Sequence, residues 1–292
     1  MRALYDVAAP AKLNLFLHVT GRRPDGYHSL QSAMVLIDWC DTLHFELRSD
    51  GQISRTDIGQ ALPADDLILR AARALQADSG CPHGAQITVE KHLPVQAGLG
   101  GGSSDAASCL LALNRLWGLG YGLARLHALG LRLGADVPFF LHGQNAWAEG
   151  IGERLTVLGV PPRQFLVVKP QQGMDTALVF ADPQLNRNSE TAIISGFAAD
   201  PFAFGRNDLQ PVAQRLCPEV EQALKWLAIH GLSGRMSGSG TAVFALLAPT
   251  TADLAQMKAQ ASSWGWTLRE CSSLEAHPLL GWADCDDSSV GG

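Results

Sequence analysis

The segment PVQAGLGGGSSDAA, residues 94–107, decides the fold because its glycine-rich loop runs directly into a predicted helix. Four glycines within five positions give the backbone conformations that other residues rarely adopt, and they let backbone N–H groups approach a ligand closely. Ser103 or Ser104 is predicted to cap the helix, whose apolar face runs from Ala106 to Trp117. The N-terminus of such a helix carries free N–H donors and the positive end of the helix dipole, so the segment predicts a phosphate cradle for a nucleotide.

Two better-known phosphate loops fit this segment poorly. A Walker A motif has Lys and then Ser or Thr after its last glycine, whereas Gly102 is followed by two serines. A dinucleotide fingerprint that starts at Gly98 and Gly100 places Ser103 where its third glycine belongs. A tight turn before an ordinary core helix is the competing interpretation of the loop, so other parts of the chain must decide between the two.

Length and composition indicate a globular protein with a sizeable core. The chain has 292 residues, of which 47% are hydrophobic and 17% are charged, which suits one large domain or two ordinary ones. A net charge of −6 without a Lys/Arg block argues against a nucleic-acid partner. Six scattered cysteines without a CxxC pair favour neither a zinc site nor a disulfide framework. Without an apolar signal core or a membrane-length apolar run, the sequence predicts a soluble, cytoplasmic protein with no membrane partner.

The N-terminal half is predicted to form strands and helices around the glycine loop. Residues 11–19 alternate between apolar and polar side chains, which predicts a strand with Lys12 and Asn14 side by side on one face. A solvated face is the competing interpretation of this Lys/Asn pair. Further strands are expected at 34–37, 42–47 and 86–93, helices at 65–78 and 123–133, and loops or a hairpin at 49–63.

Two charged residues in this half stand in unusual places. Lys91 shares the apolar face of its strand, so it either snorkels to solvent or directs its cation into the nucleotide site. Asp136 lies in a turn of small residues, where Pro138 is expected to end any helix. An aspartate in such a turn either caps a backbone amide or points into a cleft.

A change in composition at residues 158–163 predicts a domain boundary, with one domain over 1–160 and a second over 161–292. Strands alternate with helices after the boundary, which predicts an α/β sandwich of ferredoxin-like type. Strands are expected at 165–169, 242–247 and 266–271, helices from 176 (capped by Thr176), from 207, and at 218–230 and 252–263, and loops at 186–204 and 235–241. Residues after Leu274 are expected at the surface, with 284–292 as a frayed tail.

Three separated segments stand in the order of a known protein family. They are PAKLNL at 10–15, the glycine and serine loop at 98–104, and SGSG at 237–240. Together they resemble the three-motif pattern of the GHMP kinases, and the resemblance extends from about Pro10 to about Leu247. It implies an α+β fold of two domains, ATP with Mg²⁺ as the cofactor, and phosphoryl transfer to a small-molecule alcohol.

Three further segments, 21–28, 134–138 and 149–153, are most similar to members of this family whose small-molecule substrate carries a cytidyl diphosphate. The resemblance implies that Asp136 is the catalytic carboxylate and Lys12 its partner. It assigns the ATP phosphates to Pro94, Val95, Gln96, Ala97, Gly98, Leu99, Gly100, Gly101, Gly102, Ser103 and Ser104. It assigns the acceptor substrate to Asn14, Tyr27, His28, Phe180, Ser237, Gly238, Ser239 and Gly240. We assign no protein ligand to the metal, because the sequence has no dense carboxylate cluster.

Other functions stay open at this stage. The same three motifs fit a GHMP kinase that acts on homoserine or on a mevalonate derivative. A nucleotide-binding sensor without catalysis is a further alternative, although the presence of both Lys12 and Asp136 argues against it. The sequence assigns no role to Asp105 or Asn207, and it fits a monomer as well as a homodimer.

Overall fold

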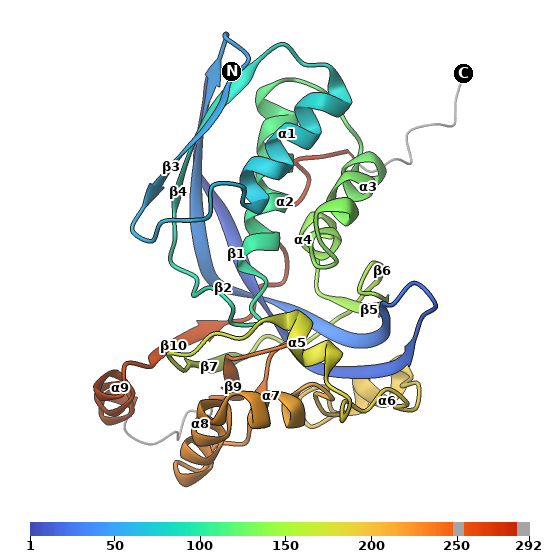
Figure 1. Cartoon of the computed structure of the whole chain (residues 1–292), viewed down its shortest axis with the longest axis vertical. Coiled ribbons are helices and arrows are strands. Elements are labelled where there is room, and N and C mark those ends of the chain that lie inside the picture. Colours follow the sequence, from blue (N-terminus) through green and yellow to red (C-terminus); the bar gives the residue numbers. More distant parts are fainter. Residues whose placement is uncertain (248–253, 285–292) are drawn as a thin grey trace.

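The structure, a computed structural model, describes residues 1–247 and 254–284, and it contains two sheets with helices packed on them (Figure 1). The strands of the first sheet are β1 (Ala3–Arg22), β2 (His28–Arg48), β3 (Ile53–Ile58), β4 (Gly84–Glu90), β5 (Ala146–Gly150) and β6 (Arg154–Val157). The strands of the second sheet are β7 (Gln164–Lys169), β8 (Gly234–Met236), β9 (Val243–Leu246) and β10 (Thr267–Ser272). None of the helices in the described part of the chain has the length and apolar character needed to span a bilayer.

The first sheet is built on the long antiparallel pair of β1 and β2, and its other strands follow the order β3-β4-β2-β5-β6. The two separate strands predicted at 34–37 and 42–47 are wrong, because β2 continues through the polar link between them. The link stays paired with β1, and a shift in register between Pro10 and Ala11 accommodates the extra residues. The segment 49–63 contains β3, which pairs in parallel with β4 and forms no hairpin.

The helices of the first half are α1 (Leu67–Ser79), α2 (Gly101–Leu116), α3 (Leu123–Leu133) and α4 (Val137–His142). The predicted serine cap of α2 is wrong: Gly100 holds the N-cap position, and no side chain caps the helix. Pro138 lies in the first turn of α4 and does not end a helix, because a proline in the first turn has no intrahelical partner to lose. The predictions of α1 and α3 are confirmed, and the side chain of Asp66 caps α1.

The second sheet has the strand order β10-β7-β9-β8, with antiparallel neighbours throughout, which confirms the predicted ferredoxin-like sandwich. Its helices are α5 (Thr176–Ala181), α6 (Ile194–Ala199), α7 (Gln210–Leu216), α8 (Pro218–Ile229) and α9 (Leu254–Ser263). Asp175, and not the predicted Thr176, caps α5 with its side chain. Residues 186–204 are not all loop, since α6 forms within them and buries Phe197.

The chain passes from the first sheet to the second at residues 158–163. We therefore propose that the boundary between the two domains lies near residue 160, as predicted. The two halves also pack against each other away from this connection. Leu17 and Val19 of β1 pack in the apolar cluster of the second half, and Leu279 packs in that of the first. The expectation of a surface segment after Leu274 is therefore wrong for part of it, while residues 285–292 of the predicted tail lie outside the described residues.

Candidate active site

A cavity of about 910 Å³ is lined by residues from both halves of the chain. It brings together most of the predicted site residues, namely Lys12, Asn14, Tyr27, His28, Pro94 to Ser103, Asp136, Phe180, Gly238, Ser239 and Gly240. Ser104 and Ser237 are predicted site residues that do not line it, and both are fully buried. Residues that the sequence interpretation missed also line it, among them Arg22, Leu67, Asp175 and Thr176.

The first turn of α2 opens onto this cavity. The N–H of Ser104 donates to the carbonyl of Gly100 (2.9 Å), and Gly101, Gly102 and Ser103 precede it and line the cavity. The N–H groups of these three residues lie in the first turn, where a helix supplies no acceptor. Gly98 is required beside them, because its φ is +73° and an added Cβ would collide with a backbone carbonyl oxygen.

The loop at 237–240 packs against the phosphate loop and is hydrogen-bonded to it. The buried Ser237 hydroxyl donates to the carbonyl of Gly98 (3.0 Å) and accepts from the N–H of Asn14 (3.2 Å). Asn207, which the sequence left without a role, donates to the carbonyl of Gly238 (2.7 Å). These buried bonds fix β1, the phosphate loop and the second small-residue loop relative to one another.

Lys12 and Asp136 meet at the centre of the cavity. The Lys12 side chain is only 3% exposed, and its Nζ lies 3.4 Å from Oδ2 of Asp136. The same Nζ donates to Oδ1 of Asn14 (2.5 Å), whose Nδ2 in turn donates to the hydroxyl of Ser32 (2.8 Å). Asp136 immediately precedes α4 but makes no capping bond to it, so its carboxylate remains free to face Lys12. The solvated face considered for Lys12 and Asn14 is therefore wrong.

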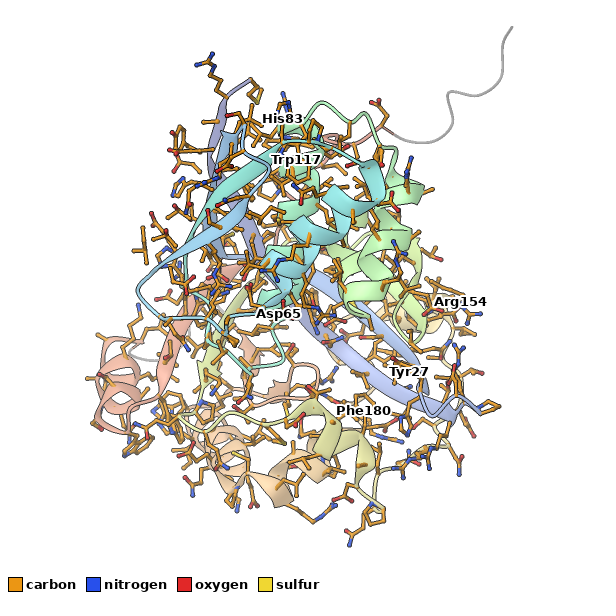
Figure 2. The ribbon with its side chains drawn as sticks, turned by 45° about the horizontal axis from the view of Figure 1, so that its top comes forward. Tyr27, Asp65, His83, Trp117, Arg154 and Phe180 are labelled. Atoms are coloured by element: carbon orange, nitrogen blue, oxygen red, sulfur yellow. The ribbon has the colours of Figure 1, made fainter. Side chains whose placement is uncertain are left out.

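Aromatic side chains gather at the end of the cavity near the connection between β1 and β2 (Figure 2). The buried ring of His28 stacks on Phe180 of α5, with 5.1 Å between ring centroids and 28° between ring planes. Tyr27 is 59% exposed and lines the same cavity. Burial and the nearby charges of Arg187 and Arg22 lower the pKa of His28, so this ring is neutral near pH 7.

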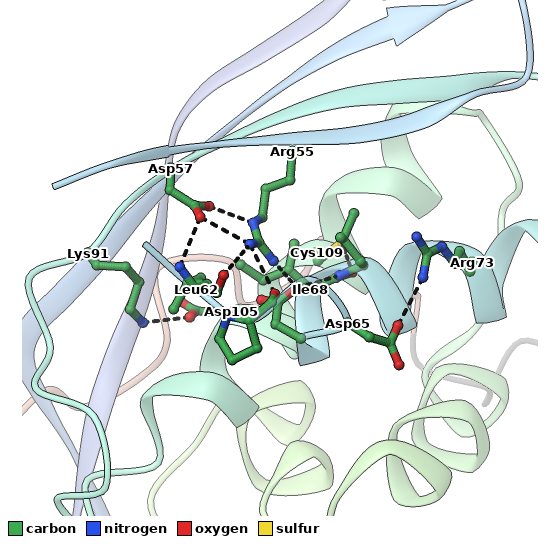
Figure 3. A network of polar contacts seen from close by, with 12 residues as sticks. Arg55, Asp57, Leu62, Asp65, Ile68, Arg73, Lys91, Asp105 and Cys109 are labelled. Atoms are coloured by element: carbon green, nitrogen blue, oxygen red, sulfur yellow. Dashed lines mark hydrogen bonds and ion pairs between the residues drawn. The ribbon is translucent and has the colours of Figure 1, made fainter. Parts of the chain in front are cut away.

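Lys91 lies in a buried ion cluster between β4 and the phosphate loop, and it does not snorkel (Figure 3). Its Nζ lies 2.7 Å from Oδ2 of Asp105 in α2 and forms a second ion pair with Asp41 of β2. Asp41 also accepts hydrogen bonds from the N–H groups of His92 (2.6 Å) and Leu93 (2.7 Å). One ammonium thus ties two strands to the first turns of α2. Lys91 also lines the cavity, while its ammonium is paired with the two carboxylates.

Asp105 holds its proton more tightly than an ordinary aspartate. Its Oδ1 is buried without a hydrogen-bond partner, and burial together with the charge of Asp41 raises its pKa to about 7. The carboxylates of Asp105 and Asp41 in turn outweigh the effect of burial on Lys91 and raise the pKa of its ammonium. The cluster therefore places the Lys91 ammonium, which is bonded to Asp41, beside a carboxyl group that titrates near neutral pH.

We predict that this titration makes the protein less stable as the pH rises from about 4 to about 7. Over that interval folded Asp105 binds a proton that an unfolded aspartate, with a pKa of about 3.9, has released, so the free energy of unfolding falls with pH. Urea unfolding of the wild type and of Asp105→Asn at pH 5 and pH 8 measures this effect. We expect the free energy of unfolding of the wild type, relative to that of Asp105→Asn, to be lower at pH 8 than at pH 5. The same difference at both pH values would contradict the prediction.

Two models of protein domains match the chain. The family model for the GHMP kinases N terminal domain matches residues 66–144, and that for the GHMP kinases C terminal matches residues 194–265. A 4-diphosphocytidyl-2-C-methyl-D-erythritol kinase from Albidiferax ferrireducens is 62% identical over 291 residues, which cover 100% of this chain and 99% of the relative. The chain belongs to the GHMP kinases, among the 4-diphosphocytidyl-2-C-methyl-D-erythritol kinases. As a GHMP kinase it is an ATP-dependent small-molecule kinase, and such kinases typically use a divalent metal ion with ATP.

Further relatives of this GHMP kinase support the assignment. An enzyme with the same name from Variovorax paradoxus is 58% identical, and the match covers 97% of this chain and 100% of the relative. A crystal structure of a 4-(cytidine 5'-diphospho)-2C-methyl-D-erythritol kinase superposes with a TM-score of 0.75 at 35% identity, covering 91% of this chain and 98% of the other. A homoserine kinase from Cytophaga hutchinsonii shares the fold. Its structure superposes with a TM-score of 0.69 at 18% identity, covering 95% of this chain and 96% of the other.

Proposed function

We propose that this kinase transfers the γ-phosphoryl group of ATP to a methylerythritol hydroxyl of 4-diphosphocytidyl-2-C-methyl-D-erythritol, giving the 2-phosphate. The step belongs to non-mevalonate isoprenoid precursor biosynthesis. The observation that carries the proposal is the 3.4 Å pair of Lys12 and Asp136, which lies in the same cavity as the phosphate loop and the aromatic side chains. The names of the relatives at 62% and 58% identity support the choice of acceptor.

Phosphoryl transfer depends mainly on positioning the reactants and stabilising charge. In this site the N–H groups of Gly101, Gly102 and Ser103 point from a helix N-terminus at the place for β- and γ-phosphate oxygens. These donors are already held in place before ATP binds, because Ser237 and Asn207 fix the loops around them. The site therefore does not have to reorganise these donors as charge develops on the transferred group.

Lys12 and Asp136 then act on the acceptor hydroxyl. Asp136 is the one member of the pair that accepts a proton, so we assign it to orient the hydroxyl and take its proton. Lys12 carries the positive charge that stabilises negative charge on the attacking oxygen. Its place is fixed by the hydrogen bond to Asn14, whose amide is held in turn by Ser32.

We propose Mg²⁺ as the metal that accompanies ATP. Within the described residues no group of three or more His, Cys, Asp or Glu side chains is placed to hold a metal ion. Mg²⁺ at a phosphate site needs only one or two protein oxygens, since phosphates and water supply the remaining ligands. Ser103 lines the cavity, and its hydroxyl is a hard oxygen donor that fits this need. The ion would neutralise charge on the phosphates that it binds.

We assign Tyr27, His28 and Phe180 to the cytidyl group of the acceptor. Aromatic faces at the open end of the cavity suit a stacked base, and a neutral imidazole suits the polar edge of that base. The diphosphate would then lie between the base and the reacting hydroxyl, along the part of the cavity that Gly238, Ser239 and Gly240 line.

Tyr27→Ala is predicted to raise KM for the cytidyl acceptor by about tenfold while KM for ATP stays within about twofold. Tyr27 is 59% exposed, so its removal takes away stacking area without disturbing the core. Steady-state kinetics with each substrate varied in turn measure the two constants. Equal effects on both substrates would remove Tyr27 from the acceptor site.

A phosphorylation assay read by mass spectrometry tests the proposed function. The purified protein receives Mg-ATP and one of four acceptors: 4-diphosphocytidyl-2-C-methyl-D-erythritol, homoserine, mevalonate or galactose. We expect a gain of one phosphoryl group on the cytidyl compound alone. Gain on another acceptor would overturn the assignment of Tyr27, His28 and Phe180, and ATP binding without gain on any acceptor would favour a nucleotide sensor.

A further inference from the structure

Arg187 lies behind the aromatic end of the cavity, in the loop after α5, and nothing in the sequence singled it out. Its terminal nitrogens donate to three backbone carbonyls, those of Leu185 (3.2 Å), Phe180 (2.9 Å) and Asp182 (2.9 Å). These bonds fold the loop back against the C-terminal end of α5 and hold the guanidinium in one orientation. The remaining Nε–H of Arg187 then points at a side chain, Nε2 of His28, at 3.0 Å.

This last contact decides where the proton of His28 lies. A guanidinium only donates hydrogen bonds and stays charged in proteins, so Nε2 of His28 has to accept. A neutral imidazole carries one proton, and with Nε2 as acceptor that proton lies on Nδ1. A second proton on Nε2 would break the hydrogen bond and place two cations in contact. Burial, Arg187 and Arg22 all lower the pKa of His28, in agreement with a neutral ring.

The Nδ1–H group is then the only polar hydrogen of the ring. Within residues 1–247 and 254–284 no protein acceptor receives a hydrogen bond from it. The ring is stacked on Phe180 and its residue lines the cavity. Because Nε2 is occupied by Arg187, Nδ1–H is the ring group that His28 has left for a ligand at this end of the cavity, and it is a donor.

We propose that Arg187 is a positioning residue that makes the site select cytosine over uracil, because it holds His28 as the Nδ1–H tautomer. This proposal rests on the proposed function, which brings a cytidyl group to this end of the cavity. Cytosine and uracil share the acceptor O2 but differ at N3, which is a bare acceptor in cytosine and an N–H donor in uracil. An Nδ1–H donor facing N3 pairs with cytosine and opposes the N–H of uracil.

The tautomer is tested first, in the free protein, where the result does not depend on any substrate. Long-range ¹H–¹⁵N correlation spectra of histidine-labelled protein distinguish a protonated from a bare ring nitrogen, and His28→Gln assigns the signal of His28. We expect a proton on Nδ1 and a bare Nε2 in the wild type. In Arg187→Met we expect the signals to move towards the Nε2–H form that free imidazole prefers. A wild-type ring protonated on Nε2 would overturn the proposal, whichever acceptor the enzyme uses.

The selectivity is tested by the ratio of kcat/KM for the cytidyl acceptor to that for its uridyl analogue. In Arg187→Met the ring can turn its bare Nδ1 to the N3–H of uracil, so we expect the ratio to fall by about tenfold or more. The wild type measured with the same two compounds shows separately whether the cytidyl acceptor is used at all. If the ratio stays the same while both rates fall together, Arg187 only supports the loop and the proposal is wrong.

Arg215→Met is the matched control for this experiment. Arg215 also packs against the end of α5, where one of its terminal nitrogens lies 2.7 Å from the carboxylate of Asp182, but it has no contact with His28. Its replacement disturbs the same segment without touching the tautomer. We expect the cytidyl-to-uridyl ratio of this variant to equal that of the wild type, and an equal fall in both arginine variants would overturn the proposal.

Discussion

Asp136→Asn is expected to lower kcat by about 10²–10⁴-fold with the fold retained. Asparagine has almost the same shape as aspartate, so it can still lie beside Lys12, but its amide does not take a proton from the acceptor hydroxyl. The carboxylate is partly exposed and makes no capping bond to α4, so its charge matters more to chemistry than to stability. Single-turnover kinetics with saturating ATP and acceptor measure the chemical step directly.

Asp50→Asn provides the control for this experiment. Asp50 pairs with Arg48 at the far end of β2 and does not line the cavity, so its replacement should leave kcat unchanged. Circular dichroism and the binding of ATP should be the same in both variants as in the wild type. Turnover by Asp136→Asn close to the wild-type rate would remove Asp136 from its assigned role.

The sequence could predict the place of Lys12 in a strand and of the glycine loop before a helix because these signals are local. A glycine loop that runs into a helix has few structural interpretations, and the alternation of β1 places Lys12 and Asn14 on one face. The pairing of Lys12 with Asp136 needed the family resemblance, because 124 positions separate the two residues and no local pattern connects them. The structure joins them because β1 and the start of α4 line the same cavity.

The residues that the sequence missed act through contacts between distant segments. The sequence analysis missed Asp41 because it predicted a break between two strands at residues 38–41. In the structure β2 is uninterrupted, and Asp41 within it pairs with Lys91. Arg187 stands in a segment with no periodic pattern, and only the fold of the loop after α5 turns it towards His28. The predicted serine cap of α2 was wrong for a local reason, because the helix begins directly after Gly100, whose φ is positive, and both serines lie inside it.

Lys91→Met is expected to lower the free energy of unfolding by about 3–5 kcal/mol, which is among the largest effects of a single substitution. Lys91 is 4% exposed, and its removal leaves Asp41 and Asp105, which are 0% and 2% exposed, without the ammonium that lies between them. Asp41 keeps its two backbone donors, but Oδ1 of Asp105 has no hydrogen-bond partner among the described residues, so Asp105 would be driven to its protonated form. Urea unfolding at pH 7 measures the loss.

A second variant separates this charge effect from lost packing. Asp105→Asn combined with Lys91→Met removes one of the two buried acidic groups, so the double variant should recover part of the stability that the single variant loses. Lys225→Met is the control for removing a lysine, because its pair with Glu221 is exposed and contributes well under about 1 kcal/mol. A loss below about 1 kcal/mol in Lys91→Met, or no recovery in the double variant, would show that the ion cluster does not hold α2 against the sheet.

Because the first turn of α2 carries the phosphate donors, a stability loss of the predicted size should also raise KM for ATP more than KM for the acceptor.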